Sequence, residues 1–290
     1  MNVWLKASRP KTLPAAIVPV ALATALAASD GVLAGIPALL CLLFAVLIQV
    51  GTNFANDYYD YLKGADGDDR VGPTRVVSAG LVSPGRMKRA TMGVFLSAFL
   101  VGTLLIPYGG LWLLGIGVAS IVCGYAYTGG PYPLGYNGLG EVFVFIFFGF
   151  IATGVTYYVQ TGSFSVDAWL LGVIPGALAS NLLVVNNVRD METDAQVGKQ
   201  TLAVRFGDPF GRWEYVCFWG LALSATLTLS VLRSSYGVLL PWILCMPLFW
   251  LSRRLFRLSF GGPERWGRLL AQTAQILVVY GVLQVIGLLI

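Results

Sequence analysis

The segment IPALLCLLFAVLIQVGTNFANDYYD, residues 36–60, is an apolar run that ends in asparagines and aspartates. A second segment, DAWLLGVIPGALASNLLVVNNVRDMETD at residues 167–194, ends in the same way. Each apolar part is long enough to cross a bilayer as a helix, which takes about 20 residues. Carboxylates at the edge of the hydrocarbon layer are costly to hold there and therefore mark a functional site. The two segments predict membrane helices that each end in part of a site.

The spacing of the polar residues places each set on one helix face. Asn56 and Asp60 are four residues apart, as are Asn186 and Asp190, and residues three or four apart on a helix project to the same side. Two facing sets of carboxylates suit a hard divalent cation, and Mg²⁺ held in this way completes its shell with water and substrate phosphates. The predicted metal ligands and catalytic residues are Asp57, Asp60, Asp190 and Asp194.

The composition of the whole chain is that of a membrane protein. Hydrophobic residues make up 57% of its 290 residues, charged residues make up 11%, and the mean hydropathy is +0.74, whereas soluble domains carry about 25% charged residues. We predict an all-α polytopic bundle, a single transmembrane domain over residues 1–290, with about nine membrane helices. The predicted spans are 12–29, 36–58, 90–107, 111–128, 140–160, 167–188, 213–232, 236–252 and 269–290.

Lysine and arginine are distributed unevenly between the connections of this scheme. All 19 basic residues except Arg233 lie in the first eleven residues or in the second, sixth and eighth connections. Basic residues stay on the cytoplasmic side of a membrane, so the N-terminus and both acidic segments are predicted to face the cytoplasm and the C-terminus the outside. The net charge of +5 is then a topology signal. It requires no nucleic-acid partner, and no obligate protein partner is indicated.

Two features of the composition exclude several kinds of chemistry. The chain has no histidine, which removes histidine general bases, histidine-ligated haem iron and histidine-bearing zinc sites. The four cysteines stand singly in apolar spans without CxxC spacing, so they are interpreted as packing residues. They are Cys41, Cys123, Cys217 and Cys245.

Each acidic segment continues into a polar loop in which cations follow the carboxylates. That order suits a Mg²⁺–diphosphate, because carboxylates hold the metal, the metal holds phosphate, and cations neutralise the remaining charge. The alternative is that the carboxylates are solvated helix ends and the cations only anchor the topology. The predicted substrate-binding residues are Asn53, Asn56, Lys63, Arg75, Asn186, Asn187, Lys199, Arg205 and, from the first helix, Arg9.

Three stretches carry a resemblance to a known family: NDYYD at 56–60, RVGPTR at 70–75 and NNVRDMETDAQVGKQTLAVRFG at 186–207. ASRPKTLP at 7–14 and YTGGPYPLGYNGLGE at 127–141 add to it. The chain resembles the UbiA-type intramembrane aromatic prenyltransferases, most of all those that use 1,4-dihydroxy-2-naphthoate in menaquinone or phylloquinone synthesis. The resemblance implies a nine-helix bundle with a central cavity, a cytoplasmic cap and a lateral opening to lipid.

The resemblance also implies a reaction, the transfer of a polyprenyl or phytyl group from an allylic diphosphate to 1,4-dihydroxy-2-naphthoate. Loss of the carboxylate then gives demethylmenaquinol. The expected partners are the prenyl diphosphate, the aromatic acid and the bilayer of the cytoplasmic (inner) membrane, and the expected cofactor is Mg²⁺ or Mn²⁺. Ionisation of the diphosphate would produce an allylic cation, which needs a site without water.

Several alternatives stay open at the level of sequence. Within the family, the acceptor can instead be 4-hydroxybenzoate, homogentisate or haem. Many benzoate-using members carry a lysine in the loop after the fourth helix, and residues 125–140 have none. Asp66 lies six rather than the usual four residues beyond Asp60, which weakens it as a metal ligand. Outside the family, a cation transporter is disfavoured because its acids are expected near mid-bilayer, whereas both clusters here lie toward one face.

Overall fold

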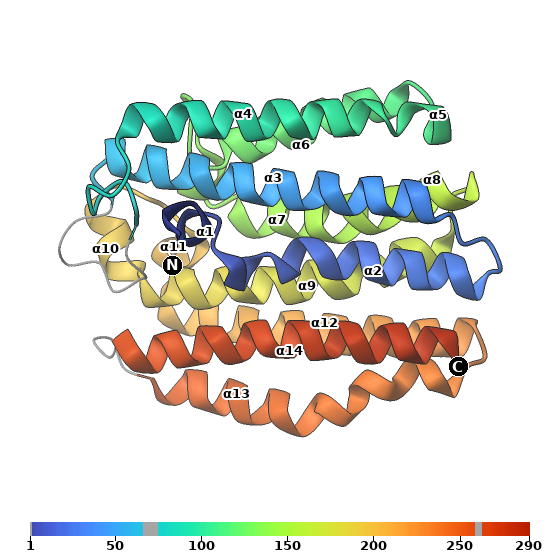
Figure 1. The fold of residues 1–290 in the computed structure, drawn as a ribbon. Coiled ribbons are helices and arrows are strands. Elements are labelled where there is room, and N and C mark those ends of the chain that lie inside the picture. The colour runs from blue at the N-terminus through green and yellow to red at the C-terminus, as the bar shows by residue number, and fades with distance from the viewer. Residues whose placement is uncertain (1, 66–74, 259–262) are drawn as a thin grey trace.

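The computed structural model describes residues 2–65, 75–258 and 263–290, and every regular element in these ranges is a helix (Figure 1). The longer helices are α2 (Pro14–Ser29), α3 (Gly35–Leu62), α4 (Pro84–Thr103), α6 (Trp112–Ala126), α9 (Val166–Arg189), α12 (Asp208–Leu232), α13 (Cys245–Arg257) and α14 (Pro263–Leu289). One continuous helical segment consists of α7 (Gly140–Val144), the π-helix η3 (Phe145–Val155) and α8 (Thr156–Thr161). The short helices are α1 (Val3–Ala7), η1 (Pro10–Thr12), α5 (Ile106–Gly109), η2 (Leu134–Tyr136), α10 (Met191–Gln196), α11 (Leu202–Phe206) and η4 (Tyr236–Leu244).

Among the described residues, 6 helices are long and apolar enough to cross a membrane. The segments Val3–Thr12 and Pro14–Ser29 are bent by 53° relative to each other, and the number of spans rises to 7 if this pair counts as one. The all-helical membrane bundle is confirmed, but the predicted count of nine is not. Helices α4 and α6, which correspond to the predicted spans 90–107 and 111–128, account for the difference. Helix α6 has only 15 residues, fewer than the about 17 that a crossing needs, and α4 carries three basic residues in its first two turns.

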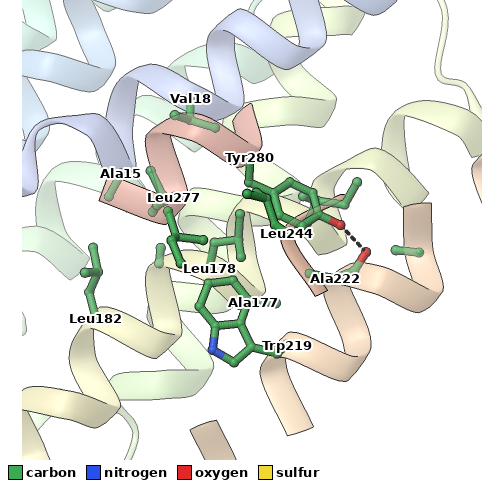
Figure 2. Close-up of a cluster of buried hydrophobic side chains, with 14 of the residues drawn as sticks. Ala15, Val18, Ala177, Leu178, Leu182, Trp219, Ala222, Leu244, Leu277 and Tyr280 are labelled. Carbon is green, nitrogen blue, oxygen red and sulfur yellow. Dashed lines mark hydrogen bonds between the residues drawn. The ribbon is translucent and has the colours of Figure 1, made fainter. Parts of the chain in front are cut away.

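Helix α9 is the centre of the bundle, and 78% of its most apolar window is buried. A helix that is apolar on all sides is stable only when neighbours surround it, and α9 packs against α12, η3, α14 and α2. Figure 2 shows one part of this core, where the Tyr280 hydroxyl donates to the Ala222 carbonyl at 3.2 Å. The residues that meet there are Ala15, Val18, Ala177, Leu178, Leu182, Trp219, Ala222, Leu244, Leu277 and Tyr280.

Glycines allow η3 and α9 to approach closely. A Cβ atom on Gly149 would lie 2.7 Å from the carbonyl oxygen of Gly172, and one on Gly176 would lie 2.9 Å from that of Phe145. Small residues at such contacts let membrane helices pack backbone against backbone. The contact fixes the position of the helical segment 140–161 along α9 and therefore sets Glu141, in its first turn, beside Asn187.

The end of the bundle opposite α10 and α11 is held by an ion-pair network (Figure 1). Arg233, which follows α12, donates to Asp30 at 2.7 Å, to Ser29 at 3.0 Å and to Asp167 at 2.9 Å. Burial lowers the pKa of Arg233, but the bonds to the two carboxylates outweigh this and raise it above the usual arginine value. The basic residue that departs from the charge pattern of the other connections is therefore neutralised by carboxylates from α2 and α9.

Candidate active site

A mainly apolar cavity of about 260 Å³ lies between α2, α3, α6, η3 and α9. Along α3 its lining extends from Cys41 to Asn56, which is about 22 Å at 1.5 Å per residue. Asn56 and Asn186 line the polar end. Asp60 and Asp190 follow them by one helical turn, so the carboxylates lie just beyond the mouth of the cavity, where α10 and α11 are located (Figure 1).

The two carboxylates of the first acidic segment are buried and bonded in different ways. Asp60 accepts from Arg75 and from the Tyr136 hydroxyl, both at 2.9 Å. Asp57 accepts from the backbone N–H groups of Val76 at 3.2 Å and Val77 at 3.4 Å. These two valines pack in an apolar cluster with residues of α3 and α4, so the hydrophobic contact seats this turn over Asp57.

The loop after α6 covers the first acidic segment. Lys63 donates to the Thr128 carbonyl at 2.6 Å, and its ammonium lies 3.9 Å from the centre of the Tyr136 ring. The Thr128 hydroxyl donates to Asn56 at 2.8 Å. Burial lowers the pKa of Lys63, and the charge of Asp60 partly counteracts this.

In the second acidic segment each aspartate is also paired with a cation. Arg189 forms a two-pronged bond to Asp190, with both distances 2.6 Å, and Lys199 donates to Asp194 at 2.9 Å. Burial raises the pKa of Asp194, Lys199 lowers it, and the charges of Asp190 and Asp60 raise it further. The two acidic segments are therefore close enough to interact electrostatically.

Three of the predicted substrate-binding residues bond to parts of the protein that frame the site. Asn53 donates to the Ser8 carbonyl at 2.9 Å and to the Thr12 hydroxyl at 3.1 Å, while it also lines the cavity. Asn187 donates to the Glu141 carboxylate at 2.5 Å, and Arg205 donates to the Asn137 carbonyl at 3.0 Å. Asn53 thus holds the N-terminal segment, Arg205 holds the loop before α7, and Asn187 holds the first turn of α7.

Arg9 occupies an unusual backbone conformation, with φ at 50° in the left-handed region. Such a conformation costs a non-glycine residue about 1–3 kcal/mol, and the bonds from Asn53 to residues on both sides of Arg9 help to hold it. The guanidinium acts electrostatically on Asp57. The turn between α1 and η1 therefore brings a cation toward the first acidic segment, and substrate binding by Arg9 stays a prediction.

The donor atoms fit a divalent cation in kind, although they are not arranged around one. Carboxylate oxygens from two segments are the ligands that Mg²⁺ prefers, but within residues 2–65, 75–258 and 263–290 no three acidic or cysteine side chains form a group able to hold a metal. Asp60, Asp190 and Asp194 each bond a cation instead. A bound metal would take over those carboxylate oxygens and release Arg75 and Lys199 to other anions. Asp66 and Arg70 lie outside the described residues.

Tyr136 is the residue at this site that the sequence does not single out as a ligand. It is only 8% exposed and contacts Asp60 as well as two lysines. Its only signal in the sequence is its place in the glycine-rich stretch 127–141, which contributes to the family resemblance.

Carboxylates and cations thus cap an apolar cavity that lies among membrane helices. This arrangement is that of an intramembrane site with a charged end and an apolar interior. The UbiA prenyltransferase family matches residues 16–276, and the chain belongs to this family. The resemblance predicted from the motifs is confirmed.

Relatives and solved structures support the assignment. The chain is 37% identical to a 1,4-dihydroxy-2-naphthoate octaprenyltransferase of Haemophilus influenzae, over 100% of this chain and 96% of the relative. It is 38% identical to the Mycobacterium tuberculosis protein of that name, over 91% and 87%. A UbiA homologue from Archaeoglobus fulgidus bound to DMAPP and Mg²⁺ has a TM-score of 0.66 at 14% identity, covering 98% of this chain and 99% of that one. A homologue from Aeropyrum pernix K1 has a TM-score of 0.68 at 13% identity, over 92% and 96%.

Proposed function

We propose that this protein transfers a polyprenyl group from an allylic diphosphate to 1,4-dihydroxy-2-naphthoate, with loss of CO₂, and so makes demethylmenaquinol for menaquinone synthesis. One observation carries the proposal. A cap of carboxylates and cations, formed by Asp60 with Arg75 and by Asp194 with Lys199, lies at the mouth of a long apolar cavity. The chain aligns along its whole length with a relative named for this reaction. A polyprenyl diphosphate has the same two parts, a charged head and an apolar tail.

In this proposal the diphosphate head binds at the cap. Mg²⁺, or Mn²⁺ in its place, would be held by Asp60, Asp190 and Asp194, with Asp57 completing the first segment, and would supply positive charge to the leaving diphosphate. Lys63, Arg75 and Lys199 lie beside these carboxylates and neutralise the phosphate charge that remains. Fixed charges aimed at the leaving group usually provide the largest part of such a rate enhancement.

The cavity below the cap keeps water away from the reacting carbon, which protects an allylic cation from hydrolysis. The diphosphate leaves with the electron pair of the C–O bond, and the electron-rich ring forms the new C–C bond at the carbon that carries the carboxylate. When CO₂ departs, its bonding pair stays with the ring. No proton has to be removed in this exchange, which agrees with a chain that has no histidine.

The acceptor assay tests this proposal. Purified protein supplied with octaprenyl diphosphate and Mg²⁺ is expected to prenylate 1,4-dihydroxy-2-naphthoate and to release one CO₂ for each product formed. 4-Hydroxybenzoate and homogentisate are expected to react far more slowly, because the loop from Tyr125 to Gly140 offers no lysine to a benzoate. Equal or faster turnover of 4-hydroxybenzoate would overturn the acceptor assignment while leaving the diphosphate chemistry intact.

We further propose nine crossings of the cytoplasmic membrane, with α4 and α6 completing the set, and with the N-terminus and the site on the cytoplasmic side. The basic connections and the acidic cap gather at one end of the bundle (Figure 1), which the charge rule places inside. In a protein freed of its four native cysteines, Lys88→Cys and Gln196→Cys should react with an impermeant thiol reagent only from the cytoplasm. Val32→Cys and Ser163→Cys should react only from outside. Outside labelling of Gln196→Cys would reverse the orientation.

A further inference from the structure

The loop between α6 and α7, residues 127–139, contacts the first acidic segment and the polar loop that follows the second, and Tyr136 takes part in both contacts. The Tyr136 hydroxyl donates to Asp60 at 2.9 Å. Its ring centre lies 3.9 Å from the Lys63 ammonium and 5.7 Å from the Lys199 ammonium. Its carbonyl accepts from the Gln200 backbone N–H at 2.8 Å. One buried side chain therefore touches a carboxylate of the first segment and a lysine from each of the two polar loops.

Other residues of the same loop form hydrogen bonds beside the first acidic segment and beyond the second. Thr128 bonds Asn56 and Lys63 beside the first segment, and the Asn137 carbonyl accepts from Arg205 beyond the second. Because the loop is bonded to the first segment and, through Gln200 and Arg205, to the polar loop that follows the second, it helps to fix the separation of the two segments. That separation decides whether carboxylates from α3 and from the end of α9 can act on one ligand.

The chemistry of a phenol suits this position. A neutral hydroxyl holds Asp60 by a hydrogen bond without cancelling its charge, whereas Arg75 neutralises it. An aromatic face attracts an ammonium through its quadrupole and does not use up the N–H donors of that ammonium. Lys63 and Lys199 are thus held near the site with donors left for an anion.

We propose that Tyr136 is a positioning residue for the diphosphate head, which orients Asp60 and sets the spacing of Lys63 and Lys199. The inference rests on the proposed function, because it takes the ligand to be a prenyl diphosphate. It does not depend on which aromatic acid accepts the prenyl group. The acceptor assay and the test below therefore fail independently.

The test compares Tyr136→Phe and Tyr136→Leu with Tyr132→Phe, a matched control in the same loop whose side chain is 59% exposed. Tyr136→Phe is expected to lower kcat/KM for the prenyl diphosphate by about tenfold or more, the effect of losing a hydrogen bond to a charged group. The KM for the donor and the Mg²⁺ concentration for half-maximal rate should rise, while the KM for the acceptor stays the same. Tyr136→Leu should be worse, because it also removes the ring between the lysines.

Two outcomes overturn the inference: Tyr136→Phe that behaves like Tyr132→Phe, or a rise of the same size in both KM values, which indicates a general loosening of the cap. If Tyr136→Phe cannot be purified, Thr128→Val tests the other end of the loop. It removes the bond to Asn56 with little change in volume, and it should raise the donor KM alone. An unchanged donor KM in Thr128→Val would contradict the role given to this loop.

Discussion

Asparagine in place of Asp60, Asp190 or Asp194 is expected to reduce prenyl transfer by about 10²–10³-fold or more, the usual cost of removing one group that stabilises transition-state charge. Each substitution removes a negative charge but keeps the side-chain volume. It takes away a predicted metal ligand and at the same time leaves Arg75, Arg189 or Lys199 without the carboxylate to which it is paired. Transfer of radiolabelled prenyl groups by purified protein measures the effect.

Glu192→Gln is the matched control for these variants. Glu192 lies in α10 between Asp190 and Asp194, but its side chain is exposed, so its activity should equal that of the unaltered protein. A chelator should abolish activity in the unaltered protein, and added Mg²⁺ should restore it. An Asp190→Asn variant with near-normal turnover, or activity that persists in excess chelator, would contradict a site shared between the two acidic segments.

The sequence predicts the helices well where the signal is local. The predicted span 167–188 is close to α9 (Val166–Arg189), because an apolar run bounded by polar residues determines its own ends. The π-helix within 140–161 is different. Its position depends on the contact of Gly149 with Gly172, which joins different helical segments. The residue pattern of either segment alone therefore cannot predict it.

The same distinction applies to the site. The ion pairs of Asp60 with Arg75 and of Asp194 with Lys199 each join an acidic segment to the polar loop that follows it, and the order of carboxylates and cations along the chain brings these residues close together. Tyr136 reaches Asp60 only because the chain closes over the bundle from a segment without charge. It therefore had no chemical signal of its own.

Two adjacent residues of the same type, Asn186 and Asn187, differ in their contacts because they lie on different faces of α9. Asn186 and Asn187 both belong to the second motif and both were predicted to bind substrate. Neighbours on a helix do not share a face, and in the structure Asn186 lines the cavity whereas Asn187 is bonded to Glu141. Asp57 likewise bonds backbone amides instead of a cation side chain, and its role as a ligand stays a prediction.

The second large effect is expected at Ala45, which lines the cavity on α3 between Cys41 and Asn53. Ala45→Trp should place an indole across the path of the prenyl tail. Losing the burial of about four methylene groups, at about 0.8 kcal/mol each, weakens the binding of a long donor about two hundredfold. Transfer from octaprenyl diphosphate should therefore nearly disappear, while dimethylallyl diphosphate, whose short chain ends near the mouth, should still react.

Leu43→Trp is the control for the cavity variant, because Leu43 lies on the same helix and is 45% exposed, so an indole there points away from the cavity. It should use both donors normally. The measurement is the ratio of the rates with the long and the short diphosphate, which cancels differences in the amount of active protein. Ala45→Trp with an unchanged ratio would mean that the tail does not follow α3. The apolar cavity would then not be the route by which the chain is held while its head reacts at the cap.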